Sequence, residues 1–257
     1  MQIEGICRRL RIDDPRFIEI ETKRRIAEKD LKDVKEFLLG RKRVKHVKAA
    51  TFFDQFLDTP SLELLKRGAS LRVRYKNNGS NVYLQYKGPG YHHQGILYRS
   101  QFSSGKLDHL PKPSAADGMV RLIRITLPGI LKTGIPLAMK WAMRRHLGRG
   151  VVGRISRGPI LCVYHKDKFE VKLGEAFLEP SIDRVHAFHV NGAGLHALAS
   201  FCEYENEVKA KDDDLEVKLD HLDKLLDFDR TVIRRFRLRA EHMDKYHRCA
   251  SGYSRRG

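Results

Sequence analysis

Several segments of the chain alternate between apolar and polar residues with a period of two, which predicts β-strands with one apolar and one polar face. The first is RFIEIETKRRI at 16–26, where two glutamates and a lysine share one face and isoleucines lie on the other. The same alternation predicts strands at 70–76, 81–88, 96–103, 166–173, 181–185 and 201–209. The turn residues NNGS at 77–80 join 70–76 and 81–88 into a predicted β-hairpin.

In other segments apolar residues recur every three or four positions, which is the spacing of one face of an α-helix. This spacing predicts helices at 28–39 and 213–228, and 234–246 is also predicted to be helical. The sequence PKPSAADG at 111–118 breaks the strand pattern, and we interpret 111–150 as a helical insertion. We expect 213–247 to be a C-terminal helical extension, and 1–257 to form a single domain.

The charge balance narrows the class of partner. Lys and Arg number 50 against 32 Asp and Glu, so the formal net charge is +18. This excess predicts an anionic partner, such as nucleic acid, an acidic membrane surface or a polyphosphorylated small molecule. The four cysteines are scattered without a CxxC pair, and the sequence predicts neither a signal peptide nor a transmembrane segment. We therefore expect a reducing, cytoplasmic location.

The polar faces of the predicted strands carry a distinctive set of charges. Glu203, Glu205 and Glu207 repeat the arrangement of the first strand, with like charges on one face. A sheet with a solvated outer face would explain any one of these strands. A closed sheet with its charged faces turned inward would instead gather carboxylates for a hard divalent cation and basic side chains for an oligo-anion. Phosphoryl transfer requires that combination.

The order of these motifs resembles the CYTH domain, or triphosphate tunnel metalloenzyme, superfamily. Its hallmark ExExK matches EIETK at 19–23, and FFDQFLDTPSLELLKRGASLRVRY resembles its stretch leading through a D-T-P turn to an LRxR strand. YLQYKGPG, SIDRV and CEYENEVK resemble its lysine strand, its late aspartate strand and its closing E-x-E strand. The resemblance covers roughly residues 16–210. It implies an α+β fold, in which a closed antiparallel eight-stranded β-barrel forms a tunnel and helices cover it.

The resemblance also implies a site. The implied catalytic residues are Glu19, Glu21 and Asp183. The implied ligands of Mg²⁺ or Mn²⁺ are Glu19, Glu21, Asp183 and two of the closing glutamates Glu203, Glu205 and Glu207. The pair Glu203 and Glu205 is favoured, and Glu205 with Glu207 fits almost as well. The implied phosphate-binding residues are Lys23, Arg72, Arg74, Lys87, Arg99 and either Arg157 or Arg154.

Family members hydrolyse triphosphates, and some cyclise ATP or synthesise polyphosphate. We predict divalent-metal-dependent hydrolysis of a triphosphate or short polyphosphate, with RNA or a nucleotide as alternative ligands. Three other hypotheses stay open: a tunnel that binds polyphosphate, nucleotide or RNA without turnover, an adenylyl cyclase, and a basic β-protein that binds nucleic acid on its outer surface. The chain has Gln101 where the family often has an acidic residue, which predicts a weaker metal position there. The oligomeric state is not predicted.

Overall fold

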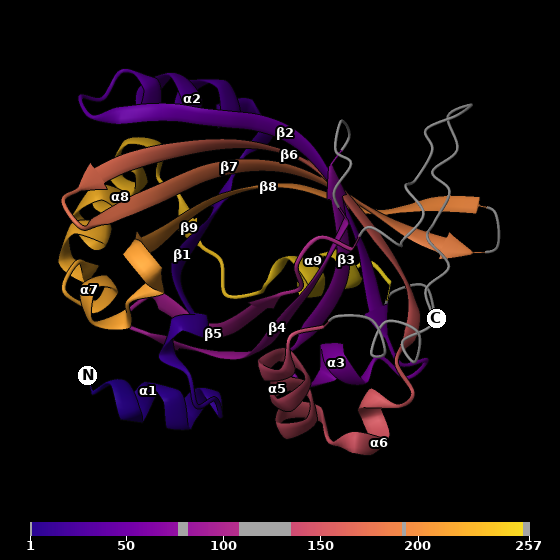
Figure 1. The fold of residues 1–257 in the computed structure, drawn as a ribbon. Coiled ribbons are helices and arrows are strands. Elements are labelled where there is room, and N and C mark those ends of the chain that lie inside the picture. Colours follow the sequence, from indigo (N-terminus) through magenta and orange to yellow (C-terminus); the bar gives the residue numbers. More distant parts are fainter. Residues whose placement is uncertain (1, 77–81, 108–134, 192–193, 254–257) are drawn as a thin grey trace.

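The computed structural model describes residues 2–76, 82–107, 135–191 and 194–253, and its strands form a closed antiparallel ring (Figure 1). The eight ring strands are β1 (Ile18–Ile26), β2 (Val44–Asp58), β3 (Ser70–Lys76), β4 (Val82–His93), β5 (Ile96–Ser103), β6 (Ser156–Leu173), β7 (Ala176–Asn191) and β8 (Gly194–Ala210). They are ordered β5-β4-β3-β2-β6-β7-β8-β1, and pairing of β1 with β5 closes the ring. The predicted closed eight-stranded sheet and the hairpin of β3 and β4 are confirmed.

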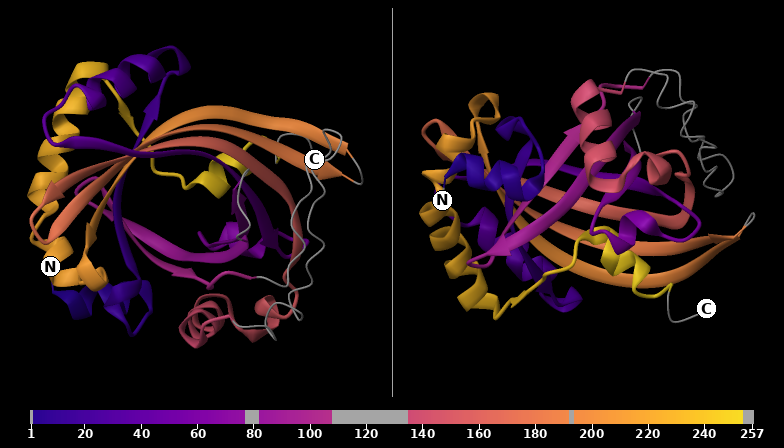
Figure 2. Two further views of the ribbon diagram at one scale, coloured as in Figure 1. Left: turned by 45° about the horizontal axis from the view of Figure 1, so that its top comes forward. Right: turned by 90° about the horizontal axis from the view of Figure 1, so that it is seen from below.

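The helices are α1 (Ile3–Leu10), α2 (Leu31–Leu39), α3 (Glu63–Lys66), α5 (Leu137–Leu147), α6 (Arg149–Val152), α7 (Leu215–Leu219), α8 (Leu222–Phe236) and α9 (Lys245–Ala250). Short 3₁₀ helices are η1 (Pro15–Phe17), η2 (Glu28–Asp30) and η4 (Lys211–Asp213). The longer helices α1, α2, α5 and α8 lie outside the ring, whereas α9 lies within it (Figure 2). Among the described residues, no helix combines the length and the apolar character that crossing a membrane requires.

The main hydrophobic core lies between the ring and the outer helices. It contains alternate strand residues, such as Ile20 and Val73, together with Leu38 of α2, Met143 of α5 and Val232 of α8. Because successive strand residues point to opposite faces, burying these apolar residues outward turns the charged residues toward the interior. The covering helices therefore determine the direction in which the charged faces point.

A second hydrophobic cluster lies inside the ring around α9. Tyr246 and Cys249 pack against inward-facing residues of β2, β6 and β7, among them Phe56, Tyr164 and Val185. The rings of Phe56 and Tyr246 stack, with their centroids 4.3 Å apart. Part of the interior is therefore apolar and filled, and the polar cavity occupies the remainder.

The predicted helix at 234–246 is wrong. Helix α8 ends at Phe236, where Arg237 adopts the left-handed conformation with φ of 51°. The chain then forms β9 (Arg239–Ala240), which pairs with Arg24 and Arg25 of β1. Helix α9 starts at Lys245, so the extended link carries the chain from the outer surface into the ring (Figure 1).

One predicted feature falls wholly outside the described residues, and another falls largely outside them. The turn at 77–80 is the first, and the insertion at 111–150 is the second. The described end of that insertion contains α5 and the start of α6. His146 of α5 lies against Tyr86 of β4, with its Nδ1 3.0 Å from the tyrosine hydroxyl. This part of the insertion therefore packs on the ring from outside.

Replacing Phe56 by Ala should destabilise the fold by about 3–5 kcal/mol, because it removes a fully buried ring and its stacking on Tyr246. Urea unfolding followed by circular dichroism measures this loss. The control is Leu137→Ala, at a side chain that is 68% exposed, which should change stability by less than about 0.5 kcal/mol. A loss below about 1 kcal/mol for Phe56→Ala would contradict the packing of α9 inside the ring.

Candidate active site in the tunnel

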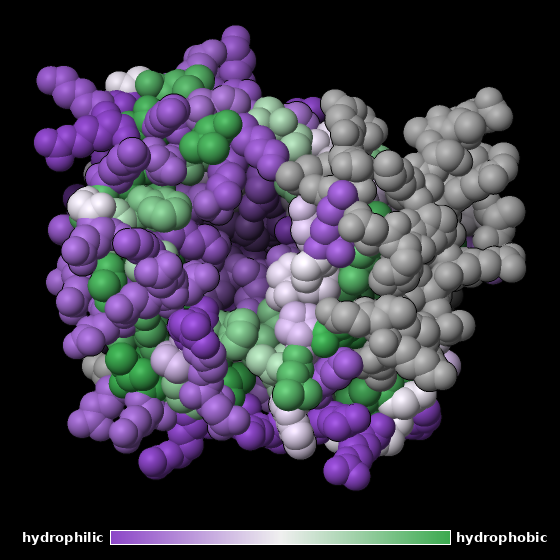
Figure 3. Space-filling view, in the orientation of Figure 1, coloured by the Kyte–Doolittle hydropathy of each residue, from purple (hydrophilic) through white to green (hydrophobic). Residues whose placement is uncertain are grey.

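A polar cavity of about 380 Å³ occupies the interior of the ring. In the space-filling view it is a hollow lined by hydrophilic side chains (Figure 3). All eight ring strands contribute to it, because every second residue of each strand points inward. The charged lining residues are Glu19, Glu21, Lys23, Lys48, Arg72, Arg74, Lys87, Arg99, Lys166, Lys168, Glu179, Glu205, Glu207, Lys209, Asp244 and Lys245.

Three carboxylates gather on β7 and β8. The pairing of these strands places Asp183 opposite Glu203 and Ser181 opposite Glu205. One carboxylate oxygen of each of Asp183, Glu203 and Glu205 lies within 4.8 Å of the others. Asp183 and Glu203 are fully buried, and Asp183 Oδ1 has no hydrogen-bond partner among the described residues. These oxygen donors, one of them unsatisfied, suit a hard cation such as Mg²⁺ or Mn²⁺.

The pKa values of two carboxylates in this acidic cluster shift in opposite directions. Burial raises the pKa of Glu203 against the lowering effect of Lys245, and the carboxylate of Glu205 adds to the rise. Burial also disfavours the charged form of Glu205, but nearby ammonium groups, Lys166 and Lys23 foremost, hold the pKa of Glu205 well below its usual value. Opposite pKa shifts on neighbouring carboxylates are typical of charges crowded together, as in many binding sites.

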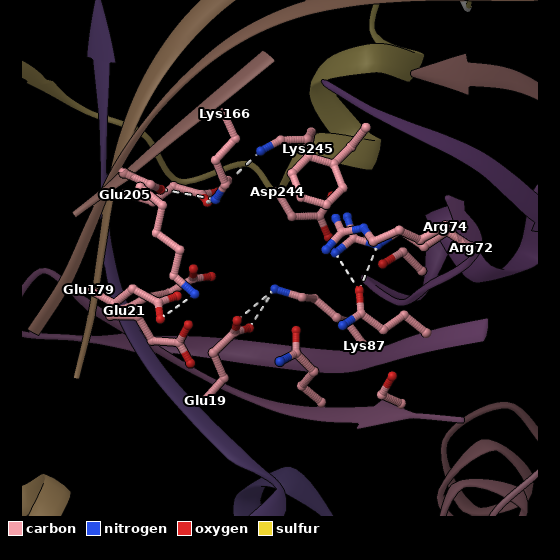
Figure 4. Close-up of a pocket in the computed structure, with 18 of the residues that line it drawn as sticks. Glu19, Glu21, Arg72, Arg74, Lys87, Lys166, Glu179, Glu205, Asp244 and Lys245 are labelled. Carbon is pink, nitrogen blue, oxygen red and sulfur yellow. Dashed lines mark hydrogen bonds and ion pairs between the residues drawn. The ribbon is translucent and has the colours of Figure 1, made fainter. Parts of the chain in front are cut away.

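The first strand contributes a neighbouring group of carboxylates. Lys87 Nζ donates to both oxygens of Glu19, at 2.8 and 2.6 Å (Figure 4). Burial alone would raise the pKa of Glu19, but Lys87 and Arg99 lower it to about 2. Glu21 lies opposite Glu207 in the pairing of β1 with β8. Burial raises the pKa of Glu207 to about 7, against the lowering effect of Lys209.

Lys23 connects the two carboxylate groups. Its Nζ lies 2.7 Å from Glu205 Oε1 and 3.4 Å from Glu21 Oε1. The structure therefore places all six of the metal ligands that the sequence predicted inside one ring. It separates them into the cluster of Asp183, Glu203 and Glu205 and the group of Glu19, Glu21 and Glu207.

Two arginines of β3 are held by one aspartate of β2. Arg72 Nη1 donates to Asp54 Oδ2 at 2.8 Å, and Arg74 donates through Nε and Nη2 to both oxygens, at 2.8 and 2.9 Å. Arg72 also donates to Gln85 Oε1 through Nε and Nη2, at 3.1 and 2.8 Å. Burial alone would raise the pKa of Asp54, but the two guanidinium groups lower it to about 2.

The remaining predicted phosphate-binding residues do not all lie in the cavity. Lys87 and Arg99 line the cavity together with Gln101, which is the residue that departs from the family pattern. Arg157 lies in β6 and pairs with Leu57, but its side chain lies outside what the structure describes. Arg154 is exposed and donates to the carbonyl of Gly150 at 3.2 Å.

Several charged residues of the site were not predicted from the sequence, among them Asp54, Lys166 and Lys245. Lys166 Nζ donates to Ser181 Oγ and to Glu205 Oε2, both at 3.0 Å. A signal for Lys166 was present, because it shares the polar face of its strand with Lys168. Lys245 follows no strand pattern, since it enters the ring on α9.

Part of the chain matches a known family. Residues 18–126 match the CYTH domain family. The ring of eight antiparallel strands and this match together confirm the resemblance to the CYTH domain. No curated protein matches the sequence.

Solved structures share the fold at low sequence identity. HpAC1 of Hippeastrum, a candidate adenylyl cyclase with a dominant triphosphatase activity, has a TM-score of 0.57 and 16% identity, covering 91% of this chain and 96% of its own. A candidate adenylate cyclase of Bacillus halodurans has a TM-score of 0.48 and 14% identity, with coverages of 88% and 94%. The capping enzyme triphosphatase of Mimivirus has a TM-score of 0.47 and 12% identity, with coverages of 90% and 95%.

Replacing Asp54 by Asn should flatten the dependence of stability on acidity. Because the pKa of Asp54 is depressed in the folded chain, its ionisation contributes stability above about pH 4 that is lost as the pH falls toward about 2. A depression of this size corresponds to about 2 kcal/mol of unfolding free energy. Urea unfolding between about pH 5 and pH 3 compares the slopes, with Asp33→Asn on the exposed side of α2 as the control. Equal slopes for wild type and Asp54→Asn would contradict the pairing with the two arginines.

Proposed function

We propose that this protein hydrolyses a triphosphate or a short polyphosphate inside the tunnel, with a divalent cation as cofactor. The observation that supports this proposal is the arrangement of charges in the cavity and in the acidic cluster at its wall. Three carboxylates cluster on β7 and β8, and Glu205 of this cluster lines the cavity. Arginine and lysine side chains from β1, β3, β4, β5 and β6 line the same cavity (Figure 4). Phosphoryl transfer needs oxygen ligands for a hard cation and basic groups for the phosphate oxygens.

The proposed cation site consists of Asp183, Glu203 and Glu205. Their oxygens are close enough to share one ion, and the unsatisfied Asp183 Oδ1 adds a buried donor. When bound, Mg²⁺ or Mn²⁺ would neutralise phosphate charge and lower the pKa of a coordinated water. Glu19 and Glu21 remain proposed catalytic residues on the neighbouring strand. A substrate that drew Lys87 away from Glu19 would free that carboxylate to orient water.

The proposed phosphate sites are pre-arranged. Asp54 and Gln85 accept hydrogen bonds from the guanidinium of Arg72 and hold it in one orientation. The N–H groups of Arg72 therefore keep their direction before a substrate binds. Holding donors rigidly reduces the reorganisation that binding and reaction would otherwise require. Arg74, Lys87 and Arg99 line the same space and would neutralise further oxygens. The net charge of +18 would favour the approach of an anionic substrate.

A tunnel that binds its ligand without turnover is the second candidate. Gln101 favours it, because an amide at this inward-facing position cannot supply an anionic metal ligand. An adenylyl cyclase is the third, and the same assay distinguishes all three.

A phosphate-release screen tests the proposal directly. We expect tripolyphosphate, ATP or thiamine triphosphate to release phosphate when Mg²⁺ or Mn²⁺ is present and not when the metals are chelated. Long-chain polyphosphate in the same screen tests chain-length preference, and chromatography of the ATP reaction detects cyclic AMP. Tight binding of tripolyphosphate with no phosphate release under any metal would replace hydrolysis by the binding hypothesis.

Two double variants test the carboxylates. Glu203→Gln with Glu205→Gln should lower phosphate release by about 100-fold or more, because loss of metal ligands removes the cation. Glu19→Gln with Glu21→Gln should lower release by a similar factor while retaining more of the metal binding. Thermal melting checks the fold of each variant, and Glu216→Gln on the exposed side of α7 is the control. Turnover like the wild type in either double variant would refute the role of that pair.

A further inference from the structure

The C-terminal segment places a lysine in the middle of the acidic cluster. Lys245 Nζ lies 2.7 Å from Asp183 Oδ2 and 3.4 Å from Glu205 Oε1, and it forms an ion pair with Glu203. These are the same three residues whose oxygens could hold a metal ion. The lysine side chain is 8% exposed, so its ammonium is a buried cation held by three carboxylates.

The preceding residue carries the opposite charge to a different part of the tunnel. Asp244 Oδ2 accepts a hydrogen bond from Arg99 Nη2 at 2.9 Å. Its other oxygen caps α9 by accepting from the backbone N–H of His247 at 2.8 Å. Two consecutive residues therefore supply an anion to a guanidinium and a cation to a carboxylate cluster. A bound phosphate would likewise bring a negative charge to Arg99, and its divalent cation would bring a positive charge to the acidic cluster.

The segment that presents these side chains is anchored separately. The hydroxyl of Tyr246 donates to Asp58 Oδ2 at 2.8 Å, and its ring stacks on Phe56. Cys249 is fully buried in the same apolar cluster. The long flexible stem of Lys245 can thus withdraw its ammonium while the backbone of α9 stays in place. The ring of Tyr164 lies 4.8 Å from this ammonium and offers a cation–π contact nearby.

We propose that Lys245 is a built-in cation that occupies the divalent-metal site of the metal-free protein and must leave before a metal binds. This inference rests on the proposed function, because it takes the acidic cluster as the metal site. Lys245 pairs with all three carboxylates, whereas Lys166 pairs with Asp183 and Glu205, Lys23 with Glu205 and Arg248 with Glu203. Close buried carboxylates repel one another, so Lys245 stabilises the metal-free fold. The same contact lowers the affinity for metal, since a metal ion must first displace a covalently tethered competitor that is always present.

The test measures Mn²⁺ binding to the full chain in the absence of substrate. The electron paramagnetic resonance signal of free Mn²⁺ reports how much of the metal remains unbound. Lys245→Met removes the charge and keeps an unbranched side chain, and it should tighten Mn²⁺ binding by about 10-fold or more. The matched control is Lys168→Met, because Lys168 lines the same cavity but pairs with Glu179 at 2.5 Å. This control should change the dissociation constant by less than about 3-fold. Lys245→Arg, which keeps the charge, should bind Mn²⁺ no more tightly than the wild type.

Thermal melting supplies a second readout. Metal-free Lys245→Met should melt below the wild type, and Mn²⁺ should raise its melting temperature more than that of the wild type, because a ligand stabilises the folded state according to its affinity. If Lys245→Met does not fold without metal, Lys245→Gln, which retains a hydrogen-bond donor, replaces it in both measurements.

The outcomes separate this inference from the proposed function. Equal or weaker Mn²⁺ binding by the Lys245 variants than by the wild type would overturn the inference and leave Lys245 as a structural ion pair. An equal tightening in Lys168→Met would also overturn it, because a general loss of positive charge would then explain the effect. Absence of Mn²⁺ binding from the wild type and all variants would overturn the metal-dependent function itself.

Discussion

Charge pairing inside the closed sheet is the constraint on which the rest of this structure depends. An isolated buried carboxylate is strongly unfavourable, and burial becomes tolerable only when a cation and hydrogen bonds accompany it. The tunnel satisfies this condition repeatedly. Glu19 faces Lys87, and Asp54 faces Arg72 and Arg74. The interior can therefore carry many charges in a folded, ligand-free chain, although each charge alone would oppose folding.

The same pairing makes the interior suitable for a charged ligand. A triphosphate with its cation would bring negative and positive groups into a space where both kinds of partner are already in place. Binding would then exchange one set of ion pairs for another and would not require new charges to be buried alone. The residues from the C-terminal segment, Asp244 and Lys245, fit this scheme because they supply both signs of charge at adjacent positions.

Strand register decides which of these charges meet. The pairing of β1 with β8 sets Lys23 opposite Glu205, and the pairing of β1 with β5 sets Glu19 opposite Arg99. A slip of one residue would turn the charged face of a strand toward the apolar helices, so the buried outer core also enforces the inner arrangement. Ring closure matters as much, because it brings the first strand beside both the fifth and the eighth.

The sequence by itself determined the strand faces, the order of the motifs and the identity of many inward-facing charges, because a period of two is a local property of the chain. It predicted that Arg72 and Arg74 share a face and that Glu203, Glu205 and Glu207 share another. Only the tertiary structure decided which charges become partners. The contact of Lys245 with Asp183 joins positions 62 residues apart. Lys245 reaches the interior on α9, and the alternation that predicts the strands gives no sign of that path. Such contacts depend on register, ring closure and the path of the C-terminal segment, and these follow from packing of the whole chain and not from local periodicity.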